Sequence, residues 1–287
     1  MKRRTFLSFV GLAGGTALAS KLASARPSTG EAAPDPEMNG ILIDTTRCEG
    51  CHTCEEVCAE ARGFPEPDLS DEALASVRDT TTKSLTVVNT FEVDGEEIYV
   101  KRGCMHCSQP ACTSACLVNA MHKDPTGPVT WDSRKCMGCR FCMISCPFDV
   151  PKFEYDEAVP KILKCTMCLD RQQAGEVPTC VENCPGEALK FGKRRELLEE
   201  ARRRIYGSPK GTYFPHIYGE HEAGGTGVLY LSAVPFEKLG FPTRIGNEAY
   251  PGYSRGFLYS VPFIFMVWPL AQLGFRQAAV AREEEQE

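Results

Sequence analysis

Sixteen cysteines constrain the fold of this 287-residue chain more than any other feature. They form four groups of four, and no cysteine is left over: Cys48, Cys51, Cys54 and Cys58; Cys104, Cys107, Cys112 and Cys116; Cys136, Cys139, Cys142 and Cys146; and Cys165, Cys168, Cys180 and Cys184. The chain is too long for the small disulfide-rich proteins in which a high cysteine content is usual. The cysteines therefore need one explanation as a set.

Three chemistries could use every cysteine. An exported chain could pair them into eight disulfides, or zinc could be held by four thiolates at each of four sites. Groups one and three, however, each run C-x2-C-x2-C-x3-C. This is the ligand run of bacterial ferredoxins, in which three cysteines hold one [4Fe-4S] cluster and the fourth reaches a neighbouring cluster. The spacing favours iron–sulfur clusters, and an exported binding protein stabilised by zinc or disulfides is the alternative from a different class.

The groups are related by an internal repeat. Residues 41–58 and 129–146 share a short apolar stretch, an aspartate four residues before the first cysteine and a glycine before the second. Groups two and four both begin C-x2-C and end C-x3-C, and an alanine follows four residues later, at Ala120 and Ala188. A repeat of this kind indicates two tandem half-modules.

The remaining pattern predicts an α+β fold of tandem bacterial-ferredoxin-like modules. Residues 84–103 contain two β-rich runs around a Val-Asp-Gly-Glu turn, which predicts a hairpin. Residues 127–132 and 187–192 predict strands, and residues 193–207 predict a helix with glutamate and arginine at i,i+4 spacing. We expect no large apolar core in the cysteine-rich domain, residues 41–207, because clusters would organise much of its interior.

The N-terminal region predicts export. Residues 1–25 have a basic start, an apolar stretch and an A-x-A cleavage site at residues 23–25, as in a signal peptide. Arg3 and Arg4, followed by Thr-Phe-Leu, are typical of the twin-arginine route, and an ordinary secretory signal is the alternative. Because iron–sulfur clusters are usually inserted inside the cell, a route for folded proteins fits a cluster-binding chain. Residues 26–40 predict a linker rich in proline and glycine.

A second apolar segment lies near the C-terminus. The 20 residues between Arg255 and Arg276 carry no charge. A helix needs about 20 such residues to cross a bilayer core, so residues 255–276 predict a transmembrane anchor that follows an extension at residues 208–254. The cysteine-rich domain would then lie outside and the tail, residues 277–287, inside. An apolar tail docked on a partner subunit is the alternative.

The cysteine groups, the twin-arginine start and the block from Tyr213 to Pro242 resemble the four-cluster electron-transfer subunits of membrane-bound oxidoreductases. Within that family the sequence is most similar to the iron–sulfur subunit of periplasmic uptake [NiFe]-hydrogenases of the hydrogenase-2 type. The β subunits of formate dehydrogenases and other molybdopterin oxidoreductases are the second interpretation. The resemblance implies a place on the periplasmic face of the inner membrane, a catalytic partner such as a [NiFe]-hydrogenase, and an integral membrane partner that reacts with quinone.

The resemblance also implies which cysteines share a cluster. In the family the first and fourth motifs share two clusters, and the second and third motifs share two more. Four sets follow: Cys48, Cys51 and Cys54 with Cys184 (set A); Cys165, Cys168 and Cys180 with Cys58 (set B); Cys104, Cys107 and Cys112 with Cys146 (set C); and Cys136, Cys139 and Cys142 with Cys116 (set D). Every cysteine position of the family is present, so four [4Fe-4S] clusters are expected.

These expectations describe an electron-transfer subunit, and no catalytic residue is predicted. No nickel-binding pair or nucleotide-binding loop is found in the sequence, and the net charge of −6 gives no reason to expect nucleic acid as a partner. His52 and His106 lie inside cysteine motifs whose thiols are complete. They are therefore expected beside clusters or exposed to solvent, rather than as ligands.

Overall fold

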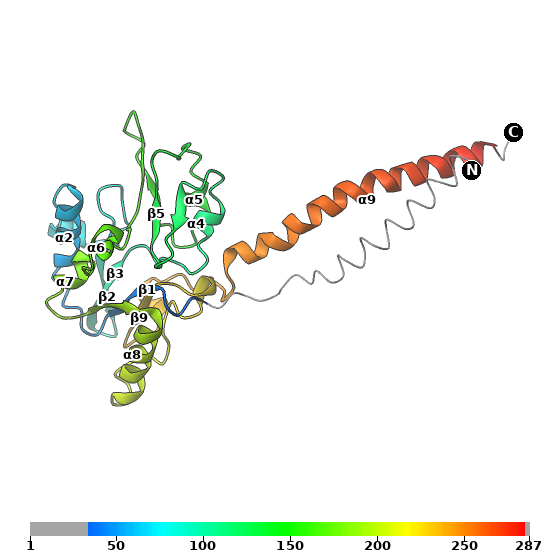
Figure 1. Cartoon of the computed structure of the whole chain (residues 1–287). Coiled ribbons are helices and arrows are strands. Elements are labelled where there is room, and N and C mark those ends of the chain that lie inside the picture. The colour runs from blue at the N-terminus through cyan, green and yellow to red at the C-terminus, as the bar shows by residue number, and fades with distance from the viewer. Residues whose placement is uncertain (1–33, 285–287) are drawn as a thin grey trace. The chain divides into compact units, whose positions relative to one another are not determined.

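The computed structural model describes residues 34–284; the predicted signal peptide and most of the predicted linker lie outside these residues. The central element is a three-stranded sheet in the order β8-β1-β9 (Figure 1). Strand β1 (Asn39–Asp44) pairs antiparallel with β8 (Leu189–Lys193) and parallel with β9 (Val228–Leu231). Three distant parts of the sequence therefore meet in one sheet.

The other sheets among residues 34–284 are three two-stranded ones. They consist of β2 (Val87–Val93) with β3 (Glu96–Arg102), β4 (Met121–Lys123) with β5 (Val129–Trp131), and β6 (Lys152–Phe153) with β7 (Ile162–Leu163). The predicted hairpin is confirmed as β2–β3, and its turn residues Asp94 and Gly95 have φ values of 56° and 87°. Two residues with positive φ are what a tight hairpin turn requires. The other two predicted strands are confirmed as β5 and β8.

Most helices are short and adjoin cysteine motifs. Among residues 34–284, the helices before the C-terminal one are α2 (Thr53–Arg62), α3 (Asp71–Leu74), α4 (Ala111–Ser114), α5 (Phe141–Ile144), α6 (Leu169–Gln173), α7 (Thr179–Glu182) and α8 (Arg194–Gly207), with 3₁₀ turns η1 (Glu222–Gly224) and η2 (Phe236–Leu239). Helix α8 confirms the helix predicted at residues 193–207.

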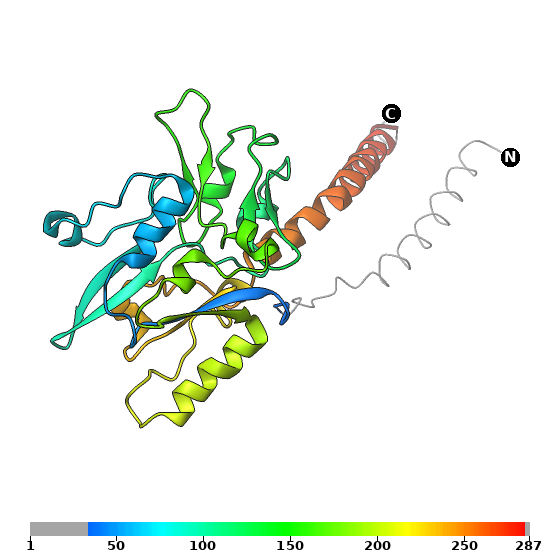
Figure 2. The same ribbon diagram turned by 60° about the vertical axis from the view of Figure 1, so that its left-hand side comes forward.

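The two faces of the central sheet contact different parts of the chain. Leu42 of β1 and Leu229 of β9 pack against Leu197 of α8. Their neighbours Ile43 and Tyr230 point to the opposite face, because side chains alternate along a strand. Figure 2 shows α8, in yellow-green, on one side of the sheet and α2, in blue, on the other. The cysteine motifs lie on the side away from α8.

The apolar core extends beyond the cysteine-rich domain, because the extension supplies its buried aromatic side chains. Tyr218, Tyr230, Phe236 and Phe241 form a buried aromatic group on the cysteine side of the sheet. All four belong to the extension, which folds back because β9 pairs with β1. The extension is therefore packed with the cysteine-rich domain.

The folded structure also begins earlier than residue 41. Met38 is 1% exposed, and its sulfur lies 3.7 Å from the hydroxyl of Ser108. Strand β1 starts at Asn39. The last residues of the predicted linker are therefore part of the packed domain.

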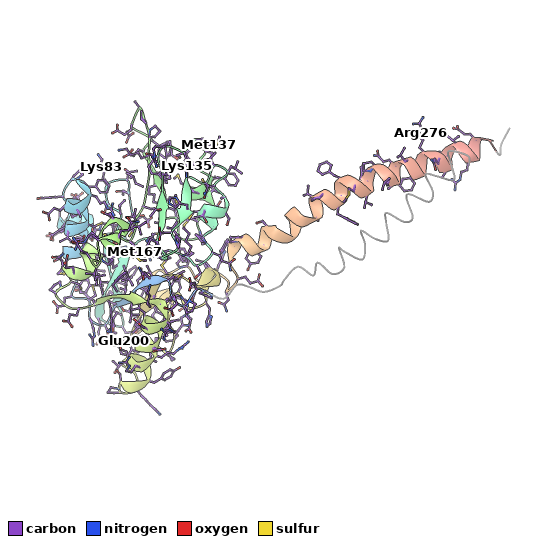
Figure 3. All side chains as sticks on the ribbon, in the orientation of Figure 1. Lys83, Lys135, Met137, Met167, Glu200 and Arg276 are labelled. Atoms are coloured by element: carbon purple, nitrogen blue, oxygen red, sulfur yellow. The ribbon has the colours of Figure 1, made fainter. Side chains whose placement is uncertain are left out.

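Helix α9 (Tyr250–Glu284) contains the predicted anchor and continues through Pro262 and Pro269. By length and composition, its stretch Ser260–Val280 could cross a membrane, and it is the one such helix among residues 34–284. This stretch starts later than the predicted segment and continues past Arg276, which Figure 3 labels on the helix.

Candidate metal centres

The thiols of set A surround one cavity at an end of the central sheet. The cavity is lined by Cys48, Cys51, Cys54 and Cys184. The first three follow β1, whereas the last precedes β8. Because these strands are antiparallel, with Ile43 opposite Leu189, the chain that leaves β1 lies beside the chain that enters β8. Pairing of the two strands thus brings together thiols that are distant in the sequence.

Set B lies around a second cavity. Its walls include all four thiols of the set: Cys58, Cys165, Cys168 and Cys180. Helix α2 supplies the first and α7 supplies the last, and these two helices contact each other. Ile41, Ile43 and Tyr230 line the same cavity from the sheet. Cys104 of set C is also on its wall, so sets B and C are adjacent.

Set C is brought together by the loop before α4 and the end of the third cysteine group. Burial raises the pKa of Cys107 far above its usual value, and the nearby thiolates of Cys104, Cys146 and Cys112 raise it further. Burial likewise raises the pKa of Cys112 to about 12, mainly because charged thiolates are poorly solvated there. Each thiol of the set is therefore an electrostatic neighbour of the others.

Set D lies next to set C, where α4 contacts α5. Burial raises the pKa of Cys142 to about 11, and the thiolates of Cys116, Cys136 and Cys139 add to the shift. Cys142 also raises the pKa of Cys112, although burial is the larger cause of that shift. The third and second cysteine groups thus meet in space.

Backbone N–H groups point at some of the sulfurs. The N–H groups of Ala120 and Met121 donate to the Sγ of Cys116 at 3.2 and 3.3 Å, and the N–H of Met167 donates to the Sγ of Cys165 at 3.3 Å. Hydrogen bonds of this kind stabilise a thiolate and tune a metal bound to it. The loops therefore suit sulfurs that carry negative charge.

A turn recurs after three of the four groups. Asn119, Asp149 and Glu187 each follow the last cysteine of their group by three residues and have φ values of 52°, 49° and 48°. Each donates its N–H to that cysteine's carbonyl oxygen at 3.2 Å. The internal repeat seen in the sequence is thus also a repeat of backbone conformation.

His106 has an unpaired nitrogen at the set B cavity. The ring is 1% exposed, and its Nδ1 accepts a hydrogen bond from the N–H of Val129 at 2.9 Å. Burial lowers the pKa of His106 well below its usual value, so the neutral ring carries its proton on Nε2. That atom is buried without a partner in the described part of the chain. An unpaired buried donor is costly, and a sulfur atom in the cavity would satisfy it.

Two buried lysines lie among the sets, and the sequence reasoning missed them. Lys101 of β3 lines the cavities of both set A and set B. The Nζ of Lys164 lies 3.7 Å from the Sγ of Cys104 and donates to the carbonyl oxygens of Val129 and Cys165. Lys164 is next to a cysteine in the sequence, which is a weak signal. Lys101 lies in a hairpin strand whose side chains alternate between two faces, and a charged residue in such a strand normally faces solvent.

The residues present fit clusters better than the other chemistries. All sixteen cysteines are free. Within residues 34–284, no three His, Cys, Asp or Glu side chains converge closely enough to hold a single metal ion. Zinc requires ligands roughly 2.0–2.3 Å from one atom, whereas the thiols of a [4Fe-4S] site bind separate iron atoms and lie farther apart. The cavities of sets A and B, each bounded by four thiols, match the second arrangement.

Comparison with known proteins agrees with this chemistry. A family model described as a 4Fe-4S dicluster domain matches residues 96–194. The hydrogenase-2 operon protein HybA of Escherichia coli O157:H7 is 36% identical over 84% of this chain and 84% of its own length. This chain belongs to the 4Fe-4S dicluster family of iron–sulfur proteins. This iron–sulfur protein is also 44% identical, over its whole length, to a protein of Nitratidesulfovibrio vulgaris of which it covers 80%.

Other relatives extend the family. The iron–sulfur subunit of the nitrate-inducible formate dehydrogenase of Escherichia coli K12 is 34% identical over 66% of this chain and 66% of its own length. The prediction of an iron–sulfur electron-transfer protein is therefore confirmed.

Proposed function

We propose that this iron–sulfur protein holds four [4Fe-4S] clusters, one at each of sets A to D, and relays electrons between a periplasmic [NiFe]-hydrogenase and a quinone-reactive membrane subunit. When bound, such clusters supply one-electron chemistry. The observation that supports this proposal most directly is that each set adjoins the next. One cysteine of each set has an electrostatic neighbour in the following set: Cys54 with Cys180 for sets A and B, Cys165 with Cys104 for sets B and C, and Cys112 with Cys142 for sets C and D.

The exposure of the thiols supports sets A and D as the two ends. Cys51 of set A and Cys139 of set D are exposed, and the other fourteen cysteines are buried or half-buried. Met167, beside Cys168, is 1% exposed, whereas Met137, beside Cys136, is 63% exposed. Figure 3 labels both residues, with Met137 near the edge of the domain. Partners could therefore approach sets A and D more closely than sets B and C.

Apolar surface distinguishes the set D end. Leu117 and Ile144 are 88% and 82% exposed. A groove lined by Leu117, Phe141 and Tyr250 joins this surface to the first turn of α9. Exposed apolar patches mark sites of contact with proteins or membranes. We therefore assign set D to the membrane partner and set A to the catalytic partner.

The same proposal places the protein on the periplasmic face of the inner membrane, after export by the twin-arginine route and with α9 as its anchor. The coverage of the relatives supports a hydrogenase partner, because HybA matches 84% of the chain and the formate dehydrogenase subunit matches 66%. In this role the chain has no catalytic site of its own, since substrate chemistry takes place on the partner.

Anaerobic purification of the tagged protein from membranes tests the proposal. We expect a nickel-hydrogenase large subunit in the purified complex, identified by mass spectrometry. After separation from its partners, this chain should retain about sixteen iron atoms, four for each cluster. A colourless protein that contains zinc would reject the cluster assignment. Recovery of a molybdopterin subunit without a hydrogenase would instead reject only the partner assignment.

A further inference from the structure

Lys101 is a buried cation without a carboxylate partner. Its side chain is in the middle of β3, and the residue is 8% exposed. The Nζ donates a hydrogen bond to the Oγ1 of Thr86 at 2.5 Å. None of the ion pairs among residues 34–284 includes Lys101. A buried charge of this kind is unfavourable unless another negative group compensates it.

The groups around Lys101 that can compensate its charge are cysteines of two different sets. The residue lines both cavities, and its electrostatic neighbours include Cys54 of set A with Cys180 and Cys165 of set B. A metal-bound cysteine is a thiolate, so with clusters in place the Lys101 ammonium group would lie between two groups of negative sulfurs.

Lys101 is held in this position by contacts on both sides of β3. The hydroxyl of Tyr230, in the central sheet, donates to the main-chain oxygen of Lys101 at 2.9 Å. Thr86, which accepts from its ammonium group, precedes β2 and donates its own hydroxyl to the main-chain oxygen of Arg102 at 2.9 Å. Both the backbone and the ammonium group are thus fixed by residues that are not metal ligands.

We propose that Lys101 is a counter-ion shared by the clusters of sets A and B, and that it raises the reduction potential of both. This inference rests on the proposed cluster assignment. Reduction adds one electron, and so one negative charge, to a cluster that is already anionic. A fixed positive charge beside it stabilises the reduced form more than the oxidised form, particularly in a poorly solvated interior.

The test is a redox titration, monitored by electron paramagnetic resonance, of the full-length protein with its partner subunits. In Lys101→Gln, we expect the reduced-to-oxidised ratio of two clusters to fall tenfold or more at a fixed applied potential, or ~59 mV for a one-electron couple. The other two clusters should keep their potentials. Selective loss of two clusters, measured as about eight fewer iron atoms per complex than in the parent, would also support a shared counter-ion.

Two lysines provide matched controls. Lys123→Gln removes a half-buried ammonium group, which donates to the main-chain oxygen of Cys107 at 2.9 Å. This control should leave the two clusters that respond to Lys101→Gln unchanged, because Lys123 lies beside set C. Lys83→Gln changes an exposed lysine, labelled at the edge of the domain in Figure 3, and should change no potential.

Each remaining outcome decides the question. Four unchanged potentials in Lys101→Gln would overturn the role of Lys101 and leave the cluster assignment intact. If Lys101→Gln does not fold, Lys101→Arg decides, because it retains the charge. Recovery of folded protein with the two potentials near their original values would support the counter-ion role, and failure of both variants would show that side-chain size is what matters. A parent protein with fewer than four clusters would instead reject the proposed function.

Discussion

Cysteine groups one and three have the same spacing but are followed by different backbone structures. Helix α2 continues past Cys58 to Arg62, whereas α5 ends at Ile144, before Cys146. The difference lies in the next residue, because Ala59 can continue a helix and Pro147 cannot. Proline lacks an N–H and disfavours helical conformation in the residue before it. The comparison shows that the cysteine spacing and the length of the helix are specified separately.

The half of the domain around sets A and B also differs from the half around sets C and D in the apolar residues that pack beside the cysteines. Thirteen buried residues, none of them cysteine, form the core beside sets A and B. The separate core beside sets C and D has five buried residues, and two of these are Cys112 and Cys142. The first half can therefore pack without its metal-binding residues, whereas the second half depends on them.

Iron removal should produce the largest difference between the two halves. In the iron-free chain, we expect amide hydrogens of β4, β5 and α5 to exchange at least tenfold faster, or ~1.4 kcal/mol in local opening free energy. Amides of β1 and β9 should keep most of their protection, because the aromatic core remains. Hydrogen exchange measured by mass spectrometry before and after anaerobic chelation checks this. Equal loss of protection in both halves would contradict the proposed difference.

A proline substitution should have the next largest effect. Ala59→Pro places proline inside α2, where Ala59 is 7% exposed, and should lower the free energy of unfolding by ~3 kcal/mol or more. The matched variant Pro147→Ala should lower it by only about 0.4–1 kcal/mol, through a more flexible unfolded chain. Urea denaturation under anaerobic conditions measures both values. Similar losses for the two variants would show that the following residue does not explain the difference between α2 and α5.

The smallest difference between cysteine groups one and three should be in the reactivity of their buried thiols. In the iron-free chain, burial raises the pKa of Cys54 to about 12 and that of Cys142 to about 11. Both thiols thus stay protonated at pH 8, and their alkylation should accelerate as pH approaches these values. The exposed Cys51 and Cys139 should react faster at pH 8, because the reagent can reach them. Mass spectrometry of iodoacetamide-treated protein would resolve each position, and uniform labelling would contradict this.

Several elements could be predicted because their signals are local. The turn around Asp94 and Gly95 marked the hairpin, and the cysteine spacing indicated iron–sulfur chemistry, which the family comparison confirmed. The aromatic core was missed because β9 lies far along the chain from its partner β1. The unpaired Nε2 of His106 was also missed, since its isolation depends on the N–H of Val129 and on the surrounding burial.

The sequence by itself determined the ligand type, the repeat and the apolar C-terminal helix, because cysteine spacing, turn residues and hydrophobic length act over short distances. Only the tertiary structure decided which groups lie side by side. Antiparallel pairing of β1 with β8 brings Cys184 to the loop after β1, and packing of the hairpin places Lys101 between two sets of thiols. The burial and charge around each set arise from those long-range contacts, and they can be read only after the chain has folded.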